Sequence, residues 1–343
     1  MDPSVVARRR DIRQLLSPRA AIQIAGPSFA RGMFAVERPE QNTPDGDGQA
    51  EDLGMRRSGA SRAGVAACVT ALACVSSAPV VRVAAQTPPP EERSASQLAP
   101  AAANTGVPPG PAFMMDLRKG FDSETQYLSD YAINQTWNGS AFDPANVRFG
   151  SNGARLLIQK RKVRGMDYAS AELQRKGFYG YGRYEAVLRS SAGSGLVSSF
   201  FTHTSRQFGD PHDEIDMEFL GRDTYEVHLA YYTDGKLAGS VYVPTGFDTS
   251  RGFHVYAFEW APESIRWFVD GRLLYEVHGP DARVPRASGR VILNVWTGGP
   301  AARDWLGPPK FRNNVSVTYR CVSHVPIGQT APQCSDTFRP PKG

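Results

Sequence analysis

The fold class is decided by Ser264-Ile265-Arg266-Trp267-Phe268-Val269-Asp270-Gly271-Arg272-Leu273-Leu274-Tyr275-Glu276-Val277. Aromatic and branched residues flank Asp270-Gly271, a pair that accepts the positive φ angles of a tight primed turn. The stretch therefore predicts a β-hairpin. From about Phe113 onward, short runs of the same kind, such as residues 154–158 and 182–188, are separated by Gly, Pro, Asn and Asp. No long helical period interrupts them, so we expect an all-β domain of two packed antiparallel sheets.

The rest of the 343-residue chain divides by composition. Residues 1–54 mix arginine, acidic and small residues, which is typical of disorder or of a mis-assigned start. Residues 55–85 combine a basic start, a short apolar run and a small-residue end, which is the pattern of a signal peptide with translation starting at Met55. A Pro- and Ala-rich linker is predicted over residues 86–112. The β domain then covers residues 113–320, and a C-terminal tail covers residues 321–343.

The predicted signal peptide implies a secreted or periplasmic protein that has no membrane association once the signal is removed. The alternative is a cytoplasmic chain in which the same segment is an Ala-rich linker. Of the four cysteines, Cys68 and Cys74 lie in the apolar run, whereas Cys321 and Cys334 lie near the end. After export, Cys321 and Cys334 would meet an oxidising compartment, where we expect them to pair. Without export they would remain free thiols.

The charge distribution excludes several classes of function. The formal net charge is +5 and the pI is near 9.0, but acidic and basic residues are interspersed through the aromatic-rich half. The sequence therefore shows no nucleic-acid patch. It also has no zinc spacing of Cys and His and no phosphate loop of the Walker type. We expect a monomer that needs no cofactor.

An acidic segment, Asp213-Glu214-Ile215-Asp216-Met217-Glu218-Phe219-Leu220, alternates with period two. In a strand, Glu214, Asp216 and Glu218 would share one face, and the apolar residues would share the other. Three adjacent carboxylates repel one another, so a purely structural strand would gain from breaking the row. A solvated face, a calcium site and a pair of glycosidase carboxylates all remain possible from the row alone.

Distances along an extended strand are compatible with the glycosidase interpretation. Four residues span roughly 13 Å, and each Glu leans about 4 Å from its Cα, which leaves roughly 5 Å between the carboxylates of Glu214 and Glu218. A retaining glycosidase needs such a gap, whereas an inverting one needs roughly 6.5 to 9.5 Å. Calcium would also require loop carbonyl and amide oxygens, which a regular strand supplies poorly.

Aromatic residues favour a sugar-binding cleft, because sugar rings stack on Trp and Tyr side chains. Trp260 and Trp267 stand in apolar strand contexts and are predicted to lie in the core. Trp296 is followed by Gly298-Gly299 and preceded by Asn294, which is more typical of a cleft residue. Further aromatic candidates are Trp137, Tyr232 and Trp305.

The acidic segment with the following Gly221 matches the signature E-x-D-x-E of glycoside hydrolase family 16, and residues 178–185, 195–201, 252–260 and 294–296 support the match. Over about residues 113–320 the chain resembles that family, most closely the lichenase-like β-1,3-1,4-glucanases and the rhizobial exopolysaccharide glycanases. The acidic segment is uninterrupted, whereas laminarinase-like members insert one residue before the second Glu. The resemblance implies a curved β-jelly-roll sandwich with a polysaccharide in its concave face.

By motif position, the resemblance implies that Glu214 is the nucleophile, Glu218 the general acid/base, and Asp216 the residue that tunes and orients the pair. It implies a retaining endo-β-glucanase acting by double displacement. A transglycosylase with the same carboxylates and a non-catalytic glucan-binding lectin on the same sandwich are the alternatives. The motif also places substrate contacts at Asn134, Glu172, Phe201, Tyr232, Asn294 and Trp296.

Several positions depart from the family pattern. Gln174 replaces the Arg of lichenases, Ala230 replaces an Asn, and His212 replaces the Trp before the signature. These changes should weaken contacts with plain mixed-linkage glucan, so a decorated exopolysaccharide is also a candidate substrate. Arg320 stands where the family's structural calcium ligand, an Asp, is expected. We therefore expect no metal here.

Overall fold

The computed structural model describes residues 108–133 and 136–340. The predicted segments 1–54 and 55–85, most of the predicted linker, and Cys68 and Cys74 lie outside the described residues. Within the described part of the chain, two antiparallel sheets pack face to face. The predicted all-β sandwich of two curved sheets is confirmed.

The outer sheet has the strand order β14-β13-β12-β7-β16-β5-β4, and β1 pairs with β16. Its strands are β1 Phe113–Asp116, β4 Val147–Gly150, β5 Gly153–Ile158, β7 Gly182–Arg189, β12 His254–Ala261, β13 Ser264–Val269, β14 Arg272–His278 and β16 Val315–Pro326.

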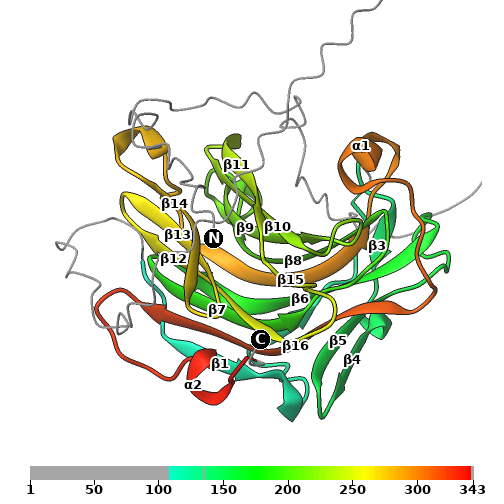
Figure 1. Cartoon of the computed structure of the whole chain (residues 1–343), viewed down its shortest axis with the longest axis horizontal. Helices are drawn as coiled ribbons and strands as arrows, with labels where there is room; N and C mark the ends of the chain where they lie inside the picture. Colours follow the sequence, from blue (N-terminus) through cyan, green and yellow to red (C-terminus); the bar gives the residue numbers. More distant parts are fainter. Residues whose placement is uncertain (1–107, 134–135, 341–343) are drawn as a thin grey trace, which may run out of the picture.

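The concave sheet has the strand order β11-β10-β9-β8-β15-β6-β2, and β3 pairs with β6 in parallel. Its strands are β2 Gln126–Leu128, β3 Ser140–Phe142, β6 Tyr168–Tyr179, β8 Leu196–Thr204, β9 Asp213–Leu220, β10 Glu226–Thr233, β11 Lys236–Pro244 and β15 Gly289–Thr297. Figure 1 shows both sheets bent in the same sense, with β8, β9, β10 and β15 on the inner side of the bend.

Helices are short, and all but the C-terminal α2 lie in connections between strands. They are η1 Leu117–Lys119, η2 Pro144–Asn146, η3 Arg206–Phe208, η4 Pro280–Ala282, η5 Pro300–Ala302, α1 Arg303–Leu306 and α2 Cys334–Thr337. Within the part of the chain that the structure describes, no helix is both long and apolar enough to cross a membrane.

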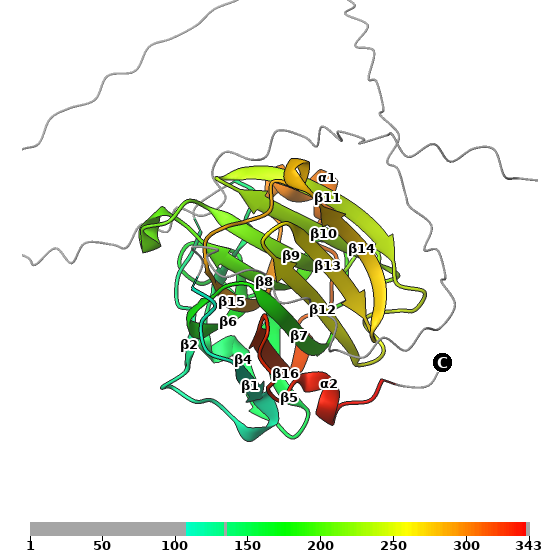
Figure 2. The ribbon, with the colours of Figure 1, turned by 90° about the vertical axis from the view of Figure 1, so that its left-hand side faces the viewer.

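The hairpin predicted over residues 264–277 is present. Strands β13 and β14 pair antiparallel across Asp270 and Gly271, whose φ angles are 49° and 81°. Positive φ at both central residues is what a type I′ turn requires. Figure 2 shows β13 and β14 side by side at one edge of the outer sheet.

The core lies between the two sheets and is rich in aromatic residues. Trp260 and Trp267 are each 1 % exposed, which confirms their predicted place in the core. Both indole nitrogens are satisfied by main-chain carbonyls: Trp260 Nε1 donates to Pro285 O at 3.0 Å, and Trp267 Nε1 donates to Asp216 O at 3.2 Å. The second bond joins the core directly to the backbone of the acidic strand.

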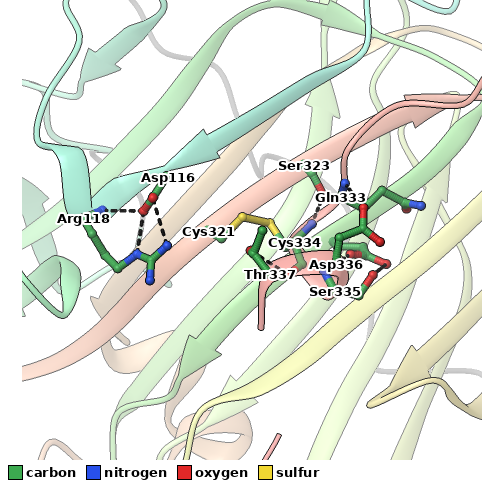
Figure 3. Close-up of a disulfide and its surroundings, with 10 residues drawn as sticks. Asp116, Arg118, Cys321, Ser323, Gln333, Cys334, Ser335, Asp336 and Thr337 are labelled. Atoms are coloured by element: carbon green, nitrogen blue, oxygen red, sulfur yellow. Dashed lines mark hydrogen bonds and ion pairs between the residues drawn. A yellow bond between two sulfur atoms is a disulfide. The ribbon is translucent and has the colours of Figure 1, made fainter. Parts of the chain in front are cut away.

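The C-terminal segment is attached to the outer sheet. Cys321 in β16 and Cys334 in α2 form a disulfide, so the predicted pairing is confirmed (Figure 3). Strand β16 continues to Pro326, which pairs with Gly182 of β7. The boundary predicted between residues 320 and 321 therefore falls inside a strand, because ladder pairing with β7 holds the chain in the sheet beyond Arg320.

Candidate active site

Strand β9 divides its side chains between the core and the concave face, as the alternation predicted. Ile215, Met217 and Phe219 are buried in the core between the sheets. Glu214, Asp216 and Glu218 project from the opposite face. The β9 ladders with β8 and β10 run without a register shift, so the strand has no bulge. All three carboxylates thus share one surface.

Antiparallel register brings most of the predicted substrate contacts to the same face. Phe201 of β8 stands opposite Asp216, and Tyr232 of β10 stands opposite Glu214. One strand further, Asn294 and Trp296 of β15 alternate with residues that face the core, and Glu172 of β6 pairs with Asn294. Asn134 lies outside the described residues. The other five predicted contacts all belong to the concave face.

Two histidines surround Glu214. His212 Nε2 lies 2.6 Å from Glu214 Oε2, and His203 of β8 stands opposite Glu214 in the ladder. Burial by itself would raise the pKa of the Glu214 carboxyl, but the hydrogen bond and charge of His212 outweigh it and lower that pKa. Burial lowers the pKa of His203 to about 4. Glu214 is therefore held as a carboxylate.

Asp216, in contrast to Glu214, is held in its neutral, protonated form. It is 3 % exposed, and burial together with the charges of Glu214 and Glu218 raises its pKa well above the usual range. A protonated Asp216 donates a hydrogen bond to Glu214, which further lowers the pKa of Glu214. A neutral central residue removes the repulsion that a row of three charges would create.

Glu218 has its own histidine partner. His228 Nδ1 of β10 lies 2.7 Å from Glu218 Oε2. The imidazole stacks on Tyr242 of β11 with ring centroids 4.5 Å apart, and the ring of Trp305 lies 5.9 Å away. Glu218 therefore lies at one end of the acidic row, beside the cluster of rings formed by His228, Tyr242 and Trp305.

Glu172 is the centre of a buried hydrogen-bond network. Its Oε1 accepts from Ser129 Oγ at 2.7 Å, from Tyr131 Oη at 2.8 Å and from Gln174 Nε2 at 2.8 Å. Its Oε2 lies 3.3 Å from Asn294 Nδ2. These contacts hold Glu172 and Asn294 in fixed orientations on the floor of the concave face.

Trp296 is 6 % exposed and belongs to a second aromatic cluster. Its ring meets Trp137 edge-on at 5.3 Å and lies 5.9 Å from Trp305. Trp137 and Trp305 are partly exposed and pack against this cluster. Trp296 therefore supports the two outer rings, which offer more surface to a ligand.

His203 and His228 were not among the predicted site residues, and neither was Arg290. Both histidines could have been found from period two, because His203 follows Phe201 by two positions and His228 precedes Tyr232 by four. Arg290 Nη1 donates to Gln174 Oε1 at 3.1 Å, so a guanidinium reaches this region from β15. No local sequence pattern predicts the contact between Arg290 and Gln174.

A cavity of about 600 Å³ lies beside the first residue of β9 and is lined in part by Phe178, Asp213 and Arg286. Asp213 accepts from the backbone N–H groups of Arg286 and Ala287, which anchors the adjoining loop. The three carboxylates of the acidic row do not line this cavity. The acidic row lies instead on the concave face, outside this cavity.

The expected calcium position does not suit a cation. The guanidinium of Arg320 lies 3.8 Å from the ring centroid of Phe253 in a cation–π contact. A calcium ion needs several oxygen ligands, whereas this position supplies a positive charge. The Arg320 side chain therefore cannot serve as a ligand of a calcium ion at this position.

Two glutamates on one face of a curved β-sandwich, flanked by aromatic rings and separated by a neutral Asp, define a glycosidase-type site. A family model for glycosyl hydrolases family 16 matches residues 131–314. The chain belongs to this family, whose β-glucanases have a jelly-roll fold. Glycosidases of this family typically need no cofactor.

Relatives with curated names support the same assignment. The chain is 38 % identical over 226 residues to a β-glucanase of Acetivibrio thermocellus, and it spans 64 % of that relative's length. It is 45 % identical over 182 residues to a β-glucanase of Bacillus amyloliquefaciens, with 53 % of this chain and 72 % of the relative covered. A β-1,3-1,4-glucanase (lichenase) structure derived from a mouse hindgut metagenome superposes with a TM-score of 0.60 at 32 % identity, covering 63 % of this chain and 99 % of the other.

Proposed function

We propose that this chain is a retaining endo-β-glucanase that hydrolyses β-1,3-1,4-glucan or a related exopolysaccharide. One observation carries the proposal: the three acidic side chains on the concave face of β9 have different electrostatic surroundings. Glu214 is held ionised by His212 and Asp216, whereas Glu218 has a separate partner in His228. Double displacement needs two such glutamates in different roles.

In this mechanism the Glu214 carboxylate attacks the anomeric carbon, while Glu218 donates its proton to the departing glycosidic oxygen. A covalent glycosyl-enzyme forms. Glu218 then takes a proton from water, the water oxygen bonds to the anomeric carbon, and Glu214 leaves as a carboxylate. Asp216 donates a hydrogen bond to Glu214 and so steadies the charge that returns there.

Azide rescue of the two alanine variants tests the assignment of roles. With an aryl β-oligoglucoside as substrate, Glu218→Ala still forms the glycosyl-enzyme, so azide should release a β-glycosyl azide. Glu214→Ala has room for azide in place of the nucleophile and should give the α-azide. The exposed Glu276→Gln of the outer sheet is the control and should keep full activity. The same azide anomer from both variants would contradict the roles.

The substrate and the type of transfer are tested together. Purified enzyme is incubated with lichenan, laminarin, xyloglucan and an acidic exopolysaccharide, and product sizes are followed over time. Shortening chains on lichenan support endo-hydrolysis, and products longer than the substrate would support a transglycosylase. The names of the sequence relatives favour hydrolysis over transfer. Binding to lichenan without any cleavage would instead support the lectin alternative.

We also propose that the protein is exported. The disulfide between Cys321 and Cys334 supports this, because such bridges persist in oxidising compartments. N-terminal sequencing of the mature protein tests it. A chain that begins after Ala85 supports export with signal removal, whereas retention of residues 55–85 on the mature protein would contradict it.

A further inference from the structure

His203, His212 and Glu214 form a cluster with the geometry of a metal site. Each residue offers one ligand atom, and the three atoms lie within 4.8 Å of one another. It is the one such group of three among residues 108–133 and 136–340. Strand pairing brings the ligands together, because His203 of β8 stands opposite Glu214 of β9 and His212 immediately precedes that strand.

The types of ligand select the class of ion. Two imidazoles and one carboxylate form a common three-ligand set for zinc, with a fourth position left for water. Calcium and magnesium prefer sites made of oxygen ligands alone. At zinc bond lengths, tetrahedral ligand atoms lie about 3.3 Å apart. The observed separations, from 2.6 Å for the His212–Glu214 pair up to 4.8 Å, bracket that value. Small side-chain rotations would close the site.

The surroundings hold the ligands in place while leaving a route for the ion. His203 is 3 % exposed and Glu214 is 6 % exposed. The ring of His212 stacks on Tyr232 with centroids 5.2 Å apart and an interplanar angle of 18°, and its side chain is 18 % exposed toward solvent. The two buried ligands, His203 and Glu214, keep the site preformed, and the partly exposed His212 lets an ion enter it from solvent.

We propose that one zinc-class divalent ion (Zn²⁺, Co²⁺, Ni²⁺ or Cu²⁺) binds between His203, His212 and Glu214 and blocks hydrolysis. Binding displaces the proton shared by His212 and Glu214 into solvent, and the ion takes its place. The carboxylate is then occupied and cannot attack the sugar. The binding half of the proposal stands by itself, whereas the inhibitory half rests on the proposed role of Glu214.

Calorimetric titration of the full chain with ZnCl₂, prepared without a polyhistidine tag, tests the binding half. We expect one site per chain, with affinity at least tenfold lower in His203→Gln and in His212→Gln. The exposed His278→Gln is the matched control and should bind as the unmodified chain does. Because Cys68 and Cys74 could also take zinc, the decisive result is the loss in the two variants. Unchanged zinc affinity in both variants would overturn the proposal.

Imidazole NMR of the unmodified chain gives a second test that does not depend on whether the variants fold. The chain has six histidines, all within the described residues. Zinc should shift the resonances of two of them, and these should be the two assigned to His203 and His212. Zinc-dependent shifts at His228, His254, His278 or His324 alone would contradict the site.

Enzyme assays separate the inhibitory half from the proposed function. Zinc should inhibit lichenan hydrolysis with the same concentration dependence as the calorimetric binding, and EDTA should restore the rate. Tight binding with no loss of rate would overturn the inhibitory half alone. If the chain hydrolyses none of the polysaccharides, the proposed function fails, and the calorimetry still decides whether the ion binds.

Discussion

His228 Nδ1 lies 2.7 Å from Glu218 Oε2, and its Nε2 lies 2.7 Å from Ser240 Oγ. Both ring nitrogens are therefore engaged, and the imidazole plane is further fixed by stacking on Tyr242. The contacts join three neighbouring strands, β9, β10 and β11, at the proposed acid/base. His228 is thus a positioning residue, because it acts on the substrate through Glu218.

Replacing His228 by Phe keeps the aromatic stack but removes both hydrogen bonds. We expect kcat on lichenan to fall roughly tenfold to a hundredfold with KM changed much less, because proton transfer depends on the orientation of Glu218. Ser240→Ala should shift the same parameters in the same direction by a smaller factor. The pH–rate profile should also change shape in His228→Phe. A kcat and a profile equal to those of the unmodified enzyme would show that His228 has no positioning role.

The acidic strand could be predicted from the sequence because period two sets which face a side chain occupies before any partner strand is known. Alternation alone placed Glu214, Asp216 and Glu218 together, and the Asp270-Gly271 pair marked a hairpin whose turn angles follow from local chemistry. The neutral state of Asp216 could not be predicted, because it depends on burial under side chains from other strands.

Period two is enough to place His203 and His228 on the concave face, but the carboxylate that each histidine meets could not be predicted, for a different reason. His203 meets Glu214, and His228 meets Glu218, only because β8, β9 and β10 are neighbours with a particular register. Strand order and register are non-local properties, which a single sequence without an alignment does not display. The resemblance supplied Tyr232 and Asn294 by position, but it supplied no histidine.

Arg290 and Gln174 provide a prediction about substrate affinity. Arg290 Nη1 donates to Gln174 Oε1, and Gln174 Nε2 donates to Glu172, so the three side chains form one row across β15 and β6. The resemblance places an Arg at position 174, and here the guanidinium comes from the neighbouring strand instead. We expect Arg290→Gln to raise KM for lichenan about tenfold, which corresponds to about 1.4 kcal/mol.

A double-mutant cycle checks that interpretation. If the guanidinium is what binds substrate, Gln174→Arg combined with Arg290→Gln should recover part of the lost affinity. Gln174→Arg alone should weaken binding, because two guanidinium groups would then repel each other. If the binding free energy lost by the combined variant, calculated from its KM, equals the sum of the losses of the two single variants, Arg290 has only a structural role.

The disulfide between Cys321 and Cys334 provides a prediction about stability. It closes a loop with a sequence separation of 13, and a loop of that size is worth about 3 kcal/mol in the chain-entropy account. We expect the double variant Cys321→Ser with Cys334→Ser to lose about that much free energy of unfolding in urea titrations. A reductant should lower the Tm of the unmodified chain and leave that of the double variant unchanged. An equal decrease of Tm in both proteins would mean that the reductant acts on something other than this disulfide.

His324 provides a prediction about stability and pH. Its side chain is buried in β16 against the rings of Tyr184 and Tyr179, with centroids 4.4 and 5.4 Å away. Burial lowers its pKa to about 4, from about 6.5 in an unfolded chain. Because the folded pKa is the lower one, the stabilisation is complete above pH 6.5 and is lost as the pH falls toward 4. The loss attributable to this one residue is about 3 kcal/mol at most.

The buried His203 has a similarly lowered pKa and adds to the same acid dependence, so a comparison of variants is needed to isolate His324. Unfolding free energies of the unmodified chain and of His324→Phe are measured in urea at pH 7.5 and pH 4.5. The variant cannot take up a proton at this position, so its stability should fall less between the two pH values, whatever its stability at pH 7.5. His324→Gln has no titrating group either and should show the same reduced dependence. An equal fall in all three proteins would mean that His324 takes up its proton at the same pH in the folded and the unfolded chain, and therefore that burial against the two tyrosine rings does not lower its pKa.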